Sequence, residues 1–266
     1  LRSPAASRKT SKGKQYRLSL GADVTYTEKN GPGGETVRQF LDAGENPPQG
    51  VIVTYYLKEA PEGEVTLKVW DSQDRLINTF TSTVPENQSG DGDQEPRLPA
   101  VSGINRFVWN MRYPDARKVP GDKTTEDMTT GPTAPPGDYR LRLSVDGMEQ
   151  TREFQIVKDP RVAASQADFD SQFELHIGIR DKLSETHDSI NKLRNIRRQV
   201  EEWEQRAESH SSAEAVASAA IPLKEKLAAI ENELVQVDHK GARDRLNLPV
   251  KLNRKLAEIV AVVASA

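Results

Sequence analysis

The sequence predicts an α+β protein whose strands and helices are segregated: an antiparallel immunoglobulin- or fibronectin-like β-sandwich, followed by a long helical hairpin with a third helix. Before residue 158 the apolar residues come in short alternating runs separated by Gly- and Pro-rich turns, a pattern typical of antiparallel strands. After residue 165 they recur every three or four positions, which is the period of a helix. We therefore expect an extended or disordered arm (1–15), a β-hairpin arm (16–50), a sandwich (51–158) and a helical domain (162–266).

The first fifty residues predict a hairpin and then a bend. The turn-forming residues 30–34 join two short runs, 24–28 and 35–40, as expected of paired strands. The stretch that follows breaks the alternation, and Pro47 and Pro48 fix an extended bend in it.

The sandwich is predicted from a series of short strands. We expect them over 51–57, 65–70, 76–80, 106–111, 138–145 and 150–157. Asp146-Gly147 is typical of the two-residue turn of a hairpin. The polar stretches 85–99 and 113–132 are expected to be long loops that a protease cuts before it cuts the helices. Because cysteine is absent, the disulfide of an antibody-type domain is excluded.

The longest predicted element is one amphipathic helix over residues 165–206. Ser165 and Asp168 form a capping signal at its start. The apolar residues that share one face are Phe169, Phe173, Ile177, Leu183, Ile190, Leu193, Ile196, Val200 and Trp203. Since a single helix cannot bury such a face alone, it must pack against other helices.

Two shorter helices are expected after it. One covers 213–237 and contains Pro222, which should kink or split it. The other has Pro249 in its first turn, where the missing N–H of proline does no harm. The simplest packing is a helical hairpin with the third helix alongside.

Composition excludes several classes of protein. The 266 residues carry a net charge of −3 with both signs mixed, which argues against a nucleic-acid-binding protein. No apolar run approaches the length of a membrane span. The absence of cysteine excludes disulfides, Cys-ligated zinc and Cys nucleophiles. The chain opens on Leu1 without a signal peptide, and we expect it to be a processed product, a cloned segment or a fragment of something longer.

Two pairs of residues are candidates for function. Asp42 and Glu45, stiffened by the neighbouring prolines, could be a general acid and base of the glycosidase type, or a structural ribbon between the hairpin and the next strand. Trp70 and Trp109 lie on predicted strands, where they could form a sugar-stacking platform or belong to the core. The residues themselves predict no catalytic site, no metal and no cofactor.

Other polar groups are explained without chemistry. His176 and His187 are eleven residues apart on one helix, roughly 16 Å, too far to share a metal ion. The acidic stretch 91–95 lacks the ligand spacing of a calcium loop. Arg194, Arg197 and Arg198 are expected to pair with glutamates one turn later on the same helix.

Several separated stretches, taken together and in order, resemble one family. They are 40–48 (FLDAGENPP), 51–57 (VIVTYYL), 103–114 (GINRFVWNMRYP), 131–139 (GPTAPPGDY), 158–161 (KDPR), 179–187 (IRDKLSETH) and 246–256 (LNLPVKLNRKL). The chain resembles the C-terminal region of large bacterial proteins labelled BNR-repeat glycosyl hydrolases or sortilin (Vps10)-like propeller proteins.

The resemblance implies a β-propeller before this region and an exported protein. No Asp-box of the propeller type occurs here, so any glycosidase chemistry would belong to the propeller, and no catalytic residue of the family maps onto this chain. We expect a non-catalytic module that docks on the propeller or on a partner chain. The alternatives are part of a glycoside hydrolase with Asp42 and Glu45, and a carbohydrate-binding sandwich with Trp70 and Trp109.

Overall fold

The chain forms two compact units, Leu1–Gln49 and Gly50–Ala266. The computed structural model describes residues 7–9, 14–19, 22–30, 36–40, 48–83, 96–125, 128–239, 241 and 244–265. In the first unit these residues form four strands.

The first unit contains one antiparallel sheet with the strand order β1-β2-β3-β4. The strands are β1 (Ser7–Lys9), β2 (Lys14–Ser19), β3 (Ala22–Asn30) and β4 (Thr36–Phe40). β3 pairs with β4 from Tyr26↔Phe40 to Asn30↔Thr36, which confirms the predicted hairpin. β1 and the start of β2 lie in the stretch that the sequence predicted to be extended or disordered.

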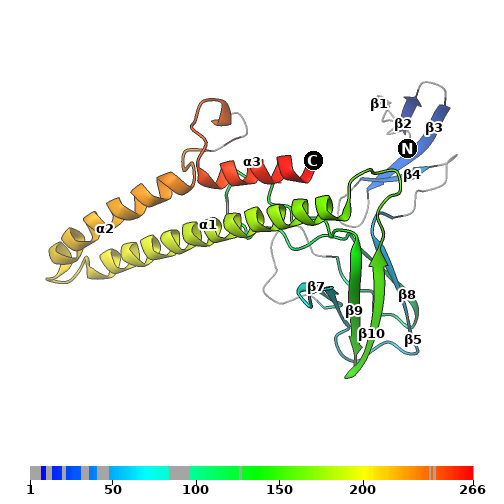
Figure 1. Ribbon diagram of the computed structural model, residues 1–266. Coiled ribbons are helices and arrows are strands. Elements are labelled where there is room, and N and C mark those ends of the chain that lie inside the picture. Colours follow the sequence, from blue (N-terminus) through cyan, green and yellow to red (C-terminus); the bar gives the residue numbers. More distant parts are fainter. Residues whose placement is uncertain are drawn as a thin grey trace. The chain divides into compact units, whose positions relative to one another are not determined.

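In its described residues the second unit has two antiparallel sheets, three α-helices and a short 3-10 helix, η1 (Asp244–Leu246), so the α+β class is confirmed (Figure 1). One sheet has the order β10-β9-β6-β7 and the other pairs β5 with β8. The strands are β5 (Val51–Leu57), β6 (Thr66–Asp71), β7 (Leu76–Thr81), β8 (Gly103–Trp109), β9 (Gly137–Val145) and β10 (Met148–Ile156).

Turn chemistry sets the ends of several of these strands. β9 and β10 are joined by Asp146 and Gly147, both with positive φ, as in the predicted two-residue turn. β8 ends at Trp109, two residues before the expected end of its strand. Met111 takes a left-handed conformation with φ 58°, and Arg112 then bridges to Thr133.

The two sheets and the first helix share one hydrophobic core. Phe80 of β7 meets Phe107 of β8 with ring centroids 4.7 Å apart, and Trp109 meets Tyr139 of β9 at 6.1 Å. Phe173 belongs to helix α1 (Gln166–Ala207), yet it packs against Tyr113 in this same core, with centroids 4.7 Å apart. The long helix is therefore anchored in the sheets by residues near its start.

α1 begins where the sequence predicted. The side chain of Ser165 accepts a hydrogen bond from the backbone N–H of Asp168, and the Asp168 carboxylate accepts one from the N–H of Ser165. This reciprocal capping box satisfies two N–H groups at the helix start. The predicted capping signal is confirmed.

α1 contacts both other helices (Figure 1). α2 (Ala213–Leu234) turns back along the far part of α1, and α3 (Leu252–Ser265) lies along the part near the strands. Pro222 lies within α2 without splitting it, because an exposed proline there removes only one internal hydrogen bond. α3 starts three residues after Pro249 rather than around it. Among the described residues, no helix combines the length and apolar character that a membrane crossing requires.

Candidate functional site

A polar cleft of about 680 Å³ lies where the end of the four-stranded sheet meets the start of α1. Asp71 and Arg75 line it from the β6–β7 turn, Tyr113 and Tyr139 from its floor, and Glu174 from α1. Its size falls in the range of small-molecule sites. We therefore ask which of its groups are available for chemistry.

The Asp71 carboxylate is buried and saturated with donors. One oxygen accepts from the backbone N–H groups of Gln73 at 2.9 Å and Arg75 at 3.0 Å. The other accepts from Arg75 Nε at 2.7 Å and from the Tyr113 hydroxyl at 3.0 Å. Burial by itself would raise the pKa of Asp71, but the hydrogen bonds from Arg75, Tyr113 and Gln73 outweigh it and lower the pKa.

The tyrosines of the cleft are locked in their neutral form. Burial raises the pKa of Tyr113, and the negative charge of Asp71 raises it further. Burial also raises the pKa of Tyr139, whose hydroxyl donates to the carbonyl of Pro135 at 2.6 Å. An ionised carboxylate whose acceptor positions are all occupied and two neutral phenols are poorly suited to proton transfer near neutral pH. We therefore interpret the cleft as a structural contact between the sheet and α1.

A second polar feature is an ordered segment that we call the strap, residues 113–132, of which 113–125 and 128–132 are described. The sequence predicted an exposed loop here. Instead Ala116, Val119, Thr124, Thr125 and Thr129 are all buried. The strap leaves the sheets, runs along α1 and returns, so the two limbs meet at its base. There Tyr113 N–H donates to the carbonyl of Pro132 and Ala116 N–H to that of Thr129.

The outgoing limb of the strap is held by a row of polar side chains on α1. Five of them bond its backbone: Arg180 to the carbonyl of Pro114 at 2.6 Å, Ser184 to the N–H of Arg117 at 3.1 Å, His187 to the carbonyl of Arg117, Asn191 to that of Lys118 at 3.2 Å and Arg194 to that of Pro120 at 3.4 Å. The returning limb is held by His176, whose Nε2 lies 3.4 Å from the carbonyl of Thr130. This face of α1 is therefore adapted to hold backbone.

The tip of the strap is tied to α3. Asp122 accepts hydrogen bonds from the hydroxyls of Thr124 and Thr125, both at 2.7 Å, and these lower the pKa of Asp122 although burial alone would raise it. Thr124 in turn accepts a bond from Asn253 Nδ2 at 2.7 Å on its hydroxyl and one from Arg254 at 2.7 Å on its carbonyl. The strap thus links α1 to α3.

Two histidines of α1 are buried. His176 is 4% exposed and His187 is fully buried. Each faces a carbonyl, which can only accept, so the facing ring nitrogen must carry the proton. Nε2 of His187 is buried and has no hydrogen-bond partner.

The arginine cluster of α1 forms contacts that the sequence did not predict. Arg194 and Arg197 reach across to Glu231 of α2, at 2.8 and 2.7 Å, and Glu231 is 2% exposed. Only Arg198 approaches a glutamate one turn later on its own helix, Glu202, at 3.7 Å. The cluster therefore fastens α2 onto α1.

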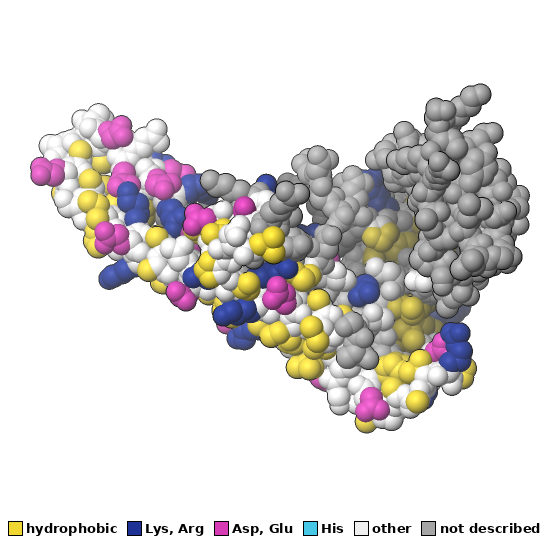
Figure 2. All heavy atoms as spheres, turned by 90° about the horizontal axis from the view of Figure 1, so that it is seen from above, with side chains coloured by type: hydrophobic (Ala, Val, Ile, Leu, Met, Phe, Trp, Pro, Cys, Tyr) yellow, Lys and Arg dark blue, Asp and Glu magenta, His cyan; other side chains and the backbone are white. Residues whose placement is uncertain are grey.

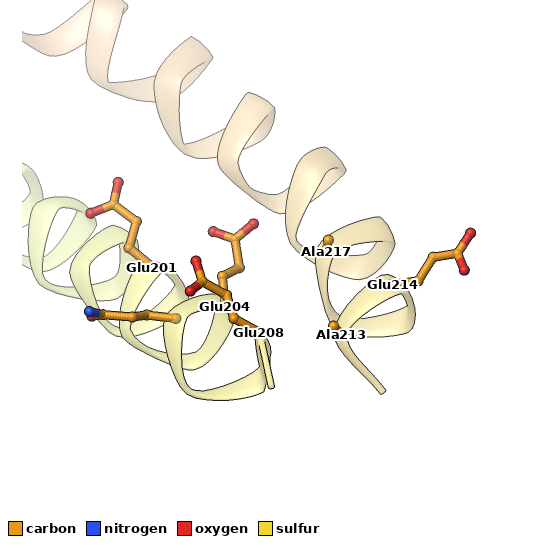
Figure 3. A pocket seen from close by; sticks show the side chains of 7 residues that line it. Glu201, Glu204, Glu208, Ala213, Glu214 and Ala217 are labelled. Carbon is orange, nitrogen blue, oxygen red and sulfur yellow. The ribbon is translucent and has the colours of Figure 1, made fainter. Parts of the chain in front are cut away.

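The far end of α1 forms an acid-lined hollow with the start of α2 (Figure 3). Glu201, Glu204 and Glu208 reach it from α1, while Glu214 of α2 points away from them in the view. Glu204 accepts two hydrogen bonds from Lys224 of α2, both at 2.8 Å. The hollow is open to solvent, and the Glu204 carboxylate in it is paired with Lys224. The hollow therefore does not indicate a ligand.

The candidate residues that the sequence suggested have different outcomes in the structure. Asp42 and Glu45 lie outside the described residues. Trp109 is 1% exposed, and its indole N–H donates to the carbonyl of Arg112 at 3.2 Å, so its ring offers no platform. Trp70 is partly exposed, but the guanidinium groups of Arg140 and Arg142 both lie 5.3 Å from its ring centroid.

A search of the described residues for a metal site and comparisons of the sequence with known proteins both gave no match. In the part of the chain that the structure describes, no three His, Asp or Glu side chains are grouped so that they could hold a metal ion. No protein-family model matches the chain, and no curated protein matches it.

Sequence reasoning missed Asp71, Tyr113 and the polar row of α1. The row did carry a signal, because positions 176, 180, 184, 187, 191 and 194 repeat every three or four residues. In the sequence alone, a row of polar residues beside the apolar face of a helix looks like a solvent-exposed face. Only the structure shows that the backbone of the strap lies on it.

Proposed function

We propose that this chain is a non-catalytic structural and interaction module from the C-terminal part of an exported bacterial protein of the BNR-repeat or sortilin-like kind. In this proposal its sheets form an immunoglobulin- or fibronectin-like sandwich, its helices form a hairpin with a third helix, and the module docks on a β-propeller or on a partner chain. The observation that carries the proposal is that the buried polar groups are engaged in holding the protein's own segments together.

The polar groups support a structural role in two places. In the cleft, Asp71 accepts four hydrogen bonds and has no capacity left for a substrate. Along α1, side chains that could bind a ligand are bonded to the strap instead. A general acid or base must reach a reacting group and exchange its proton near working pH, and these groups do neither.

The arrangement of the elements also supports the proposed architecture. Buried residues of β5 and β8 share one core with those of β6, β7 and β9, as expected for two sheets that pack face to face. α2 returns along α1 and is tied to it by Glu231, as expected of a helical hairpin. Charged side chains of both signs are mixed over the visible surface of the helices, with hydrophobic ones between them (Figure 2).

The hydrolase alternative is tested by activity. We expect the purified chain to hydrolyse no aryl glycoside, because a glycosidase needs two carboxyls held roughly 5–10 Å apart, one of them protonated. The screen includes Asp42→Asn and Glu45→Gln. Turnover that disappears in either variant would replace the module with an enzyme.

The docking proposal is tested by binding. The probe is the β-propeller segment encoded in the same reading frame, purified separately and titrated into this chain in a calorimeter. We expect a saturable complex with no covalent change in either component. A reading frame without a propeller would contradict the proposed origin of the module. A propeller that gives no heat of binding at any of several temperatures would contradict docking on the propeller.

A further inference from the structure

We propose that His176 and His187 form a pH-sensitive clasp, which holds the strap on α1 at neutral pH and releases it on acidification. The two imidazoles lie on one face of α1 and hold opposite limbs of the strap. His187 binds the carbonyl of Arg117 on the outgoing limb, and His176 binds that of Thr130 on the returning limb. Both bonds need only one ring N–H, which the neutral imidazole supplies.

Protonation would add a second N–H and a positive charge to each ring. At His187 the new proton would sit on Nε2, which is buried and has no partner. Leu183 and Ile190, one turn before and one turn after it, are both fully buried. A second N–H at this position would have no acceptor in the folded chain, and water can reach it only if the strap lifts.

The charged groups of the surrounding elements do not provide a counter-ion. Arg112 and Arg180 lie near His176 and disfavour its cation. Beside His187, the Asp188 carboxylate pairs with Arg117 of the strap at 2.7 Å. On α3, Glu258 bonds Arg254 at 2.8 Å, and on α2, Glu231 bonds Arg194 and Arg197. In the described part of the chain, no carboxylate forms an ion pair with either imidazole.

The direction of the effect follows from His176. Burial lowers its pKa, and the charges of Arg112 and Arg180 lower it further, although the Thr130 carbonyl acts the other way. A folded pKa below the unfolded value of about 6.5 means that folding favours the neutral ring. The stabilisation is therefore complete above that pH and is lost progressively as the pH falls below it.

Release of the strap would change the surface of the molecule. Ala116 and Val119 of the strap are buried against apolar residues of the helices, among them Leu183, Ile190 and Ala257. Lifting the strap uncovers both sides of this contact. An acidic environment would thus expose apolar surface along α1 while the sheets stay folded.

Amide hydrogen exchange tests the clasp in the full chain. After correction for the intrinsic pH dependence of exchange, we expect the strap amides to lose at least about tenfold protection between pH 7.5 and 5.5, while the strands of both sheets in the second unit keep theirs. The reporter is Arg117, whose backbone N–H donates to Ser184 of α1. The variants are His187→Asn, whose amide takes the place of Nδ1–H, and His176→Gln, whose amide takes the place of Nε2–H. Each should reduce the pH dependence, and together they should remove it. His210→Gln, at an exposed position between α1 and α2, is the control and should change nothing.

Two outcomes would overturn the proposal. One is a strap whose pH dependence is the same in the wild-type chain and the double variant. The other is a loss of protection over the sheets and the strap together, which would mean general acid unfolding. If the variants fail to fold, titration of the imidazole resonances in the wild-type chain decides instead. The midpoint of at least one buried histidine must coincide with the opening of the strap.

Discussion

At the residue scale, one carboxylate joins three elements. Asp71 ends β6, accepts a hydrogen bond from the hydroxyl of Tyr113 in the strap, and fixes the side chain of Arg75. The Arg75 guanidinium in turn lies 5.6 Å from the ring centroid of Phe173 and 3.7 Å from Glu174, both on α1. Removing the charge of Asp71 should therefore loosen the sheet, the strap and the helix together.

Asp71→Asn is expected to cost about 2–3 kcal/mol at pH 7, because the buried donors lose a charged acceptor. The pH dependence follows from the lowered pKa of Asp71. Its contribution is present above the usual carboxylate pKa of about 4 and is lost as the pH falls through the lower folded value. Urea unfolding at pH 7 and pH 3 should show a smaller pH effect in the variant. Asp74→Asn, at a carboxylate that is 75% exposed, is the control, and an equal change there would contradict the role of Asp71.

Gly131 shows why one residue of the strap must be glycine. A Cβ at this position would lie 2.1 Å from the carbonyl oxygen of Tyr113 and 2.4 Å from that of Pro114, where the two limbs meet. Both obstacles are backbone and cannot rotate away.

Gly131→Ala should destabilise the chain by about 1–3 kcal/mol, the usual cost of overpacking. Gly178→Ala is the matched control, since its Cβ would meet nothing within 4 Å on an exposed face of α1. That change should stabilise the helix by up to about 1 kcal/mol. Thermal melts of the two variants should move in opposite directions, and a shared direction would show that the two limbs do not approach each other closely at Gly131.

At the element scale, the buried face of α1 is shorter than its apolar stripe. Leu183 and Ile190 are fully buried, whereas Leu193, Ile196 and Val200 are half-buried and Trp203 is 63% exposed. The helix thus leaves the sheets and α3 behind before it ends, and α2 alone covers its last turns.

Ile190→Ala should cost about 2–4 kcal/mol, because it opens a cavity between the strap, α1 and the end of α2. Leu193→Ala removes a side chain of similar size from a half-buried site and should cost about half as much or less. Chemical denaturation of both variants provides the comparison. Equal losses would mean that the apolar stripe is buried along its whole length.

The sequence predicted the features that neighbouring residues determine and missed those that residues far apart in the chain determine. The capping box at Ser165, the Asp146-Gly147 turn and the β3–β4 hairpin depend on neighbouring residues, and each was predicted correctly. The strap could not be predicted, because residues 113–125 have no periodicity of their own and become ordered only through side chains about seventy positions away. The candidate site was missed for the same reason, since the partners Asp71 and Tyr113 are 42 residues apart.

At the scale of the whole molecule, the sheets and helices of the second unit are expected to unfold together. Phe173 and Ile177 of α1 pack in the core of the sheets, and the strap adds bonds between the two parts. In a Trp203→Phe chain the remaining fluorescence reports Trp70 and Trp109 of the sheets, while far-ultraviolet circular dichroism is dominated by the helices. We expect the unfolding transitions that fluorescence and circular dichroism report to coincide. Two separate ones would show that the segment 159–161 divides independently folding parts, as the sequence alone predicts.

The contacts between α1 and the strap also set a ratio of lengths. Arg180, His187 and Arg194 are spaced seven residues apart, and the strap residues that they bind, Pro114, Arg117 and Pro120, are spaced three apart. Seven residues of helix rise about 10.5 Å, and three residues of extended chain span about 10 Å. Seven residues of α1 and three residues of the strap therefore cover about the same distance. A single residue inserted into or removed from either segment would shift every later contact between them out of register. Where chains of this architecture differ in length here, the differences should come as seven helical residues for every three in the strap.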